Sequence, residues 1–139
     1  MSFDYEVKRH ESLPILIAKI GRTWGEHNMA MMFAECLDAC RDDEQHVIRI
    51  TDFSEADMSF SDVIMLVQLL SKQQVPGSFF DTRFDDVLVG TDAWVYVARD
   101  RISKFLGQHV ALFQTQEAAL RYAMRQLAHG QHTEGPAAV

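Results

Sequence analysis

V-I-R-I-T-D-F-S-E-A-D-M-S-F-S-D-V-I-M-L-V-Q-L-L, residues 47–70, is the stretch of sequence that decides the fold. It begins with β-branched residues, passes through an acidic and hydroxyl-rich segment, and continues with apolar residues at helical spacing. This pattern predicts a buried strand that leads through one short loop into a helix. Loops at the carboxyl ends of such strands are where α/β proteins place their functional groups.

The predicted loop concentrates carboxylates and hydroxyls. Its candidate interaction residues are Asp52, Ser54, Asp57, Ser59 and Ser61. A second interpretation is that these residues only start the helix. Ser59 with Asp62 three residues later has the spacing of a capping box, and acidic side chains stabilise the positive end of a helix. Both interpretations stay open.

The remaining sequence adds alternating strand and helix patterns around this unit. We expect strands near 3–8, 13–20, 47–51, 87–89 and 110–113, and helices near 28–40, 60–73, 94–106 and 116–128. The segment 94–97 is β-prone when taken alone, but apolar residues at helical spacing through 106 favour a helix. The predicted fold class is therefore α/β: one mixed sheet of about five strands, with an antiparallel N-terminal pair and later strands parallel, flanked by about four helices.

Composition limits the classes of protein that the chain could belong to. With 139 residues, 47% of them hydrophobic and 24% charged, it fits a single domain, which we place at 1–129. The small and polar residues of 130–139 predict a disordered tail. The start of the chain lacks the pattern of a signal peptide, so we expect a cytoplasmic protein without membrane insertion. A formal net charge of −7 argues against nucleic acid as a partner.

Two other kinds of site are compatible with the sequence. The first is a pocket for a small apolar ligand or lipid, lined by Met29, Met32, Phe33, Phe79, Phe80 and Trp94, although methionine at such positions is also ordinary core filler. The second is a divalent-metal or enzyme site formed by Asp52, Asp57 and Asp92. The sequence contains no P-loop, glycine-rich nucleotide motif, H-E-x-x-H or nucleophile elbow. We therefore expect no enzyme activity, cofactor or metal.

Three segments carry a resemblance to a known family. They are I-R-I-T-D-F-S-E-A-D-M-S-F-S-D-V, V-L-V-G and V-A-L-F-Q-T-Q-E-A-A-L, and over residues 3–128 the chain resembles the SpoIIAA-like family of the STAS (sulfate transporter and anti-sigma factor antagonist) fold. In phosphoregulated relatives, a serine of an Asp-Ser-Ser-Gly motif before the second helix is phosphorylated by a partner kinase, which turns partner binding off. The matching place here reads Ser59-Phe60-Ser61-Asp62, without the glycine, and Ser61 is the nearest counterpart of that serine. The resemblance implies a non-catalytic regulatory or protein-interaction module that binds another protein or itself as a homodimer.

Overall fold

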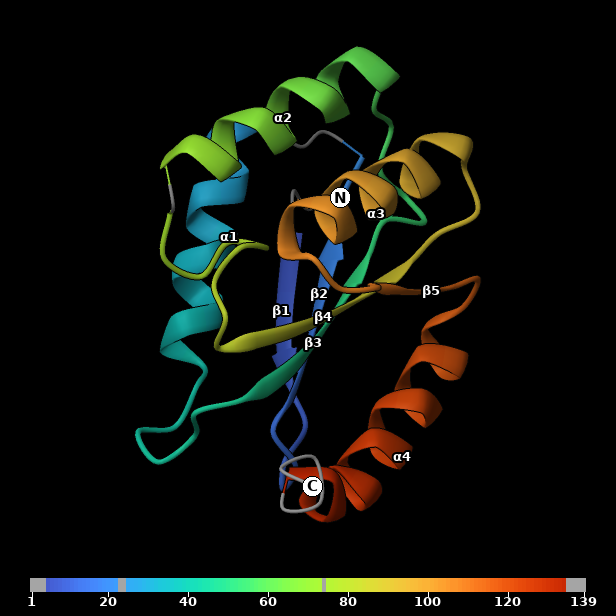
Figure 1. Cartoon of the computed structure of the whole chain (residues 1–139). Helices are drawn as coiled ribbons and strands as arrows, with labels where there is room; N and C mark the ends of the chain where they lie inside the picture. The colour runs from blue at the N-terminus through green and yellow to red at the C-terminus, as the bar shows by residue number, and fades with distance from the viewer. Residues whose placement is uncertain (1–4, 23–24, 74, 135–139) are drawn as a thin grey trace.

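The structure is a computed structural model that describes residues 5–22, 25–73 and 75–134. Within these residues the chain forms one five-stranded sheet and four helices (Figure 1). The strands are β1 (Tyr5–Arg9), β2 (Ile15–Ile20), β3 (Val47–Asp52), β4 (Phe84–Val89) and β5 (Ala111–Phe113). The helices are α1 (Glu26–Asp38), α2 (Phe60–Gln73), α3 (Ala93–Leu106) and α4 (Gln116–Glu134).

The strands follow one another across the sheet in the order β1-β2-β3-β4-β5. β1 pairs with β2 in the antiparallel sense, and each later pair is parallel. The mixed sheet predicted from the sequence is thus confirmed. The register aligns Lys19, Asp52, Val89 and Phe113 in one row. Because β3, β4 and β5 all end at this row, α2, α3 and α4 all begin near the same edge of the sheet.

The helices cover the two faces of the sheet unequally. α1 and α3 pack on one face, α2 packs on α3 as an outer layer, and α4 lies on the opposite face against β3, β4 and β5 (Figure 1). The larger apolar core lies on the face of α1 and α3, and a smaller one lies beneath α4. The alternation of side chains along β3 explains this division, because Val47 faces the larger core whereas Ile48 and Ile50 face α4.

The structure also shows where the predicted boundaries were right and wrong. Residues 93–106 form a helix, as expected, and it ends at Gly107 with a left-handed φ of 70°. β4 begins at Phe84 rather than at Val87. α4 continues through Gly130 to Glu134, so the helix does not end where the tail was predicted to begin. A glycine inside a helix costs only about 1 kcal/mol, which a long helix tolerates. Residues 135–139 and Phe3 lie outside the described residues.

Candidate functional site

The predicted site loop follows β3 and is anchored to the core by its apolar residues. Phe53 is 4% exposed, packs edge-on against Trp94 with ring centroids 5.4 Å apart, and donates its backbone N–H to the carbonyl of Val89. Ala56 is buried as well. The polar side chains between and after these anchors are exposed: Ser54, Asp57, Ser59 and Ser61. The loop therefore presents its hydroxyls and carboxylates to solvent on a fixed backbone.

Asp52 does not belong to this exposed surface, which corrects its assignment as an interaction residue. Its side chain lies on the α4 face of the sheet, and the residue is 4% exposed. One carboxylate oxygen accepts from the backbone N–H of Ser54 at 2.9 Å, and the other accepts from Nε2 of Gln116 at 2.8 Å. Asp52 therefore joins the loop to the start of α4, and this is a structural role.

The capping interpretation of Ser59 is confirmed. The Ser59 hydroxyl accepts from the backbone N–H of Asp62 at 3.1 Å, and the Asp62 carboxylate accepts from the backbone N–H of Ser59 at 3.4 Å. This reciprocal pair satisfies amides at the start of α2 that the helix cannot satisfy itself. Ser61 lies in the first turn of α2, exposed and outside this pair.

The structure does not assemble the predicted metal site. Asp57 and Asp92 are exposed, whereas Asp52 has both carboxylate oxygens engaged in the hydrogen bonds described above. Among the described residues, no group of three or more His, Cys, Asp or Glu side chains is arranged to hold a metal ion. The polar residues that follow neighbouring strands share an edge of the sheet without converging on one point.

The predicted apolar pocket is filled by its own side chains. Met29, Met32, Phe33, Phe79 and Trp94 are at most 6% exposed and belong to the larger core. Phe80 instead lies half-buried near the surface, with its ring edge-on to Phe105. The space left beside Met29, Phe79 and Trp94 is about 30 Å³, about a tenth of the volume of the smallest typical ligand pocket. The expectation of a ligand pocket is therefore wrong at this place, and core packing explains the residues.

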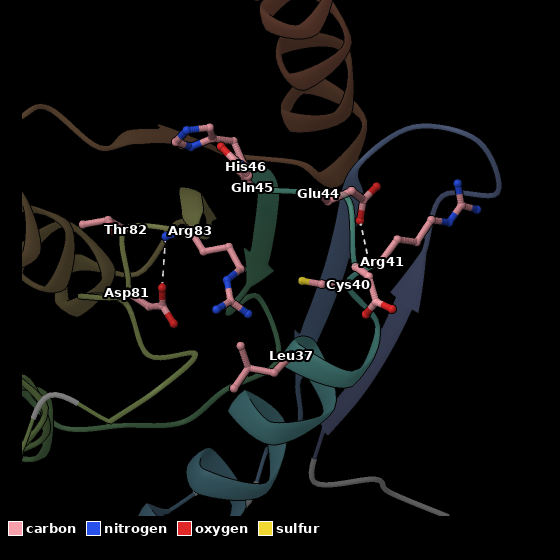
Figure 2. Close-up of a pocket in the computed structure, with 10 residues that line it drawn as sticks. Leu37, Cys40, Arg41, Glu44, Gln45, His46, Asp81, Thr82 and Arg83 are labelled. Carbon is pink, nitrogen blue, oxygen red and sulfur yellow. Dashed lines mark hydrogen bonds between the residues drawn. The ribbon is translucent and has the colours of Figure 1, made fainter.

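A larger hollow lies at the opposite end of the sheet, where β3 and β4 begin (Figure 2). Its volume is about 550 Å³, and it is bordered by the end of α1, by the connection to β3, and by the residues just before β4. Figure 2 shows Leu37, the Cys40 thiol and the Arg83 guanidinium pointing into a common space.

Two of the acidic groups at this hollow, Asp81 and Glu44, are held by structural contacts. Asp81 accepts from the backbone N–H groups of Gly77 and Arg83, at 2.7 and 3.0 Å. Glu44 accepts from the Arg9 guanidinium and from a backbone amide, and the pKa of Glu44 is lowered chiefly by the hydrogen bond from Arg9.

Cys40 is not prepared for nucleophilic chemistry. Burial raises the pKa of the Cys40 thiol more than the nearby Arg83 lowers it. The thiol donates to the carbonyl of Cys36 at 3.3 Å. Since the thiolate is the reactive form, a thiol held protonated at neutral pH is a poor nucleophile. The hollow offers an arginine to an anion, but it supports no covalent mechanism through Cys40.

The sequence analysis missed a buried ion pair in the middle of the sheet. Arg49 of β3 is 0% exposed, and its Nε donates to Asp86 of β4 at 2.7 Å. The other guanidinium nitrogens donate to the backbone carbonyls of Gly77 and Ser78. The rings of Phe33, Phe79 and Phe84 surround the guanidinium at 4.2–5.5 Å.

A charged residue inside the β-branched run V-I-R-I was the available signal for this pair, because a buried arginine needs a partner. Burial raises the pKa of Asp86 to about 6, although Arg49 lowers it. The pair fixes the connection between α2 and β4 to the central strand. We assign it a structural role.

The comparisons with known proteins support the fold and leave the function open. No family model and no curated protein matches the sequence. Among solved structures, the chain is similar to an uncharacterized protein of the DUF3478 family with a SpoIIAA-like fold from Shewanella loihica PV-4. The two share 14% sequence identity, with a TM-score of 0.55 over 85% of this chain and 90% of that one. In the part of the chain that the structure describes, no helix combines the length and apolarity needed to cross a bilayer.

The similarity to the Shewanella loihica protein, together with the mixed five-stranded sheet, shows that this protein has a SpoIIAA-like fold.

Proposed function

We propose that this protein is a non-catalytic regulatory module that binds a protein partner through the exposed side of α2 and the loop before it. We call this the α2 surface and define it as Ser54, Asp57, Phe60, Ser61 and Met65. The observation that carries the proposal is the exposure of two large apolar side chains on one helix: Phe60 is 50% exposed and Met65 is 68% exposed. A SpoIIAA-like fold is compatible with such a role.

The position of α2 explains why these side chains reach solvent. The helix lies on α3 rather than on the sheet, so only one side of it is covered (Figure 1). Val63, Val67 and Leu70 occupy the covered side and are at most 5% exposed. Phe60 and Met65 lie outside this covered side and remain largely exposed. Large apolar side chains that stay exposed on one helix are typical of sites of protein association.

The charges beside Phe60 indicate the chemistry of the partner. Glu55, Asp57 and Asp62 are exposed and acidic, although Glu55 is already paired with Lys19 at 2.5 Å. Opposite charges at the border of an interface favour encounter and orient the partners. We therefore expect a partner that offers an apolar pocket for Phe60 or Met65, bordered by lysine or arginine. Its association should weaken as salt is added, because these groups are accessible to solvent ions.

Ser61 gives this surface a point of control. It lies one helical turn before Met65, so the two side chains share a side of α2. A phosphate there would add about two negative charges in the middle of the α2 surface and change partner binding. This is the serine for which the family resemblance implies phosphorylation.

Site-specific photocrosslinking in cells tests the proposal. A photoreactive phenylalanine analogue replaces Met65 in one variant and Met124 in a control, because Met124 is 39% exposed on α4, far from α2 in the fold. We expect crosslinks to a protein at position 65 that are absent at position 124. The purified partner should bind Met65→Asp about thirtyfold more weakly than wild type, the loss of about 2 kcal/mol typical of a central contact. Equal binding by Met65→Asp and wild type would contradict the proposal.

A further inference from the structure

The first strand lies at the edge of the sheet. β1 pairs with β2 on one side, and among the described residues no strand pairs with its other side. An edge strand presents backbone N–H and C=O groups that can pair with a strand of another chain.

The hairpin register shows which residues turn these groups outward. The backbone N–H of His10 donates to the carbonyl of Ile15 at 2.9 Å, and the same register places Lys8 opposite Ile17 and Glu6 opposite Lys19. In an antiparallel ladder, alternate residues bond to the same neighbouring strand, so Glu6 and Lys8 direct their backbone groups toward β2. The residues between and beside them direct theirs away from β2, toward the outer side of β1. These are Tyr5, Val7 and Arg9.

The sequence of β1 is self-complementary around Val7. It reads Tyr5-Glu6-Val7-Lys8-Arg9, so a twofold axis at Val7 places Glu6 of each strand opposite Lys8 of the other. We propose that a second copy of this chain adds its β1 antiparallel to the first and forms one continuous sheet across that axis. Val7 would then exchange backbone hydrogen bonds with its counterpart, because its N–H and C=O are the ones that face outward.

The side chains that would pair across the axis are exposed, and within one chain they form an ion pair with each other. Glu6 and Lys8 lie on the side of the sheet where α4 packs, but α4 packs against β3, β4 and β5. The Lys8 side chain is 70% exposed and the Glu6 side chain 47% exposed, and their charged atoms lie 3.7 Å apart within one chain. Oppositely placed residues that do not share backbone bonds have the closer side chains in an antiparallel pair. Addition of the second strand therefore places Lys8 of the second copy beside Glu6, in the same row across the sheet as Lys19.

The charge pattern also fixes the register. Moving one strand by two residues, the smallest shift that keeps the outward groups paired, would place Glu6 opposite Glu6 or Lys8 opposite Lys8. Like charges placed directly opposite each other destabilise a strand pair. Only the register centred on Val7 places opposite charges together, and a shift in either direction places like charges together. This pattern favours pairing of β1 with its own copy over pairing with an unrelated strand.

On the other face of β1, helix α1 carries an exposed apolar side chain that the second copy would cover. The Tyr5 hydroxyl donates to Glu35 of α1 at 2.8 Å, which places this side of α1 along the edge of the sheet. Met31 lies one turn before Glu35 and is 46% exposed. In the proposed dimer, the two α1 helices lie beside each other across the axis, so Met31 leaves the solvent. The dimer would carry two α2 surfaces and would bind a partner that has two binding sites with higher avidity.

Charge reversal and its rescue test the proposal. Sedimentation velocity in low salt, over about 1–200 µM protein, compares wild type with Glu6→Lys, Lys8→Glu and the double variant. Each single change replaces two attractive pairs by two repulsive ones, so it should weaken the dimer about thirtyfold. The double variant restores opposite charges and should return the dissociation constant to within about threefold of wild type. Glu117→Lys, an exposed reversal on α4, is the control and should leave it unchanged.

Amide hydrogen exchange locates the interface independently. The Val7 amide should exchange more slowly in wild type at high concentration than at low concentration, and Lys8→Glu should remove this difference. Thermal unfolding confirms that each variant is folded. If Glu6→Lys disturbs β1 through Lys19, Lys8→Glu carries the test, since Lys8 lies opposite Ile17.

Two results would overturn the proposal. One is wild-type protein that stays monomeric throughout the concentration range. The other is a dimer that Lys8→Glu leaves intact, and its loss in Met65→Asp would then place the contact on α2 instead. Crosslinking at Met65 to a different protein would be unaffected by either result, so the proposed function is tested separately.

Discussion

Removal of Asp86 should be among the most damaging single changes in the protein, although no ligand or partner contact is assigned to it. Asp86→Ala leaves the Arg49 guanidinium buried with its Nε unpaired and removes one of the two hydrogen bonds of Nη2, since Nε and Nη2 now reach the carboxylate at 2.7 and 3.3 Å. The bonds from Arg49 to the carbonyls of Gly77 and Ser78 remain, but neither carbonyl supplies a neutralising charge. A buried ion left without its partner typically costs 3–5 kcal/mol.

Urea unfolding at pH 7, followed by circular dichroism, measures this cost. We expect the free energy of unfolding to fall by about 3–5 kcal/mol and the melting temperature by about 10–15 °C for a chain of this length. Asp86→Asn keeps an acceptor oxygen for Arg49 and should cost clearly less than Asp86→Ala. The matched control is Asp100→Ala, which removes an exposed carboxylate paired with Arg99 and should change stability by less than about 0.5 kcal/mol.

A small loss would refute the reasoning. If Asp86→Ala cost less than about 1 kcal/mol with an unchanged dependence on urea, Arg49 would be adequately solvated without its partner. The ion pair could then not be what fixes the connection between α2 and β4.

Three further predictions concern stability. The folded pKa of Asp86 is about 6, above its usual 3.8, so the folded state holds the carboxyl proton more tightly than the unfolded state. Wild type should therefore lose stability relative to Asp86→Ala as pH rises from about 4 to 6. In urea titrations the loss should be at most about 1.4 kcal/mol per pH unit. Ser59→Ala removes the cap of α2 and should cost about 1 kcal/mol in the same measurement, whereas Ser59→Thr should retain most of it. Gly77 has a φ of 81°, and an added Cβ would lie 2.7 Å from the carbonyl oxygen of Phe33, whereas Gly107 has a φ of 70° but open space around it. Gly77→Ala should therefore have a melting temperature well below that of Gly107→Ala. Equal melting temperatures would show that the contact with Phe33 relaxes.

The elements that sequence could predict are those whose pattern is local. The apolar spacing of residues 60–73 predicted α2, and the longer spacing through 106 correctly outweighed the β-prone start of α3. The start of β4 was missed because aspartate is depleted in strands. Asp86 occupies a strand only because Arg49, on the neighbouring strand, offers it a buried partner. That contact joins residues 37 positions apart, and no local pattern reports it.

The candidate site divides in the same way. The Ser59 cap is a relation over three residues and was predictable, as was the exposure of the loop polar groups. The role of Asp52 was not, because Gln116, which binds it, lies 64 residues further along the chain. The apolar residues assigned to a pocket have the composition of a pocket lining and of a core alike. Only the packing of three helices decides how much space remains among them.

Helix α2 is held by hydrogen bonds at its first turn and just beyond its last turn. Ser59 and Asp62 hold its first turn, and the carbonyls of Gly77 and Ser78 just beyond its last turn accept from Arg49 of the central strand. A helix restrained in this way is preorganised, so a partner that docks on it need order little backbone. The free and bound forms should then superimpose closely, and partners that differ in affinity should differ mainly in how slowly they dissociate.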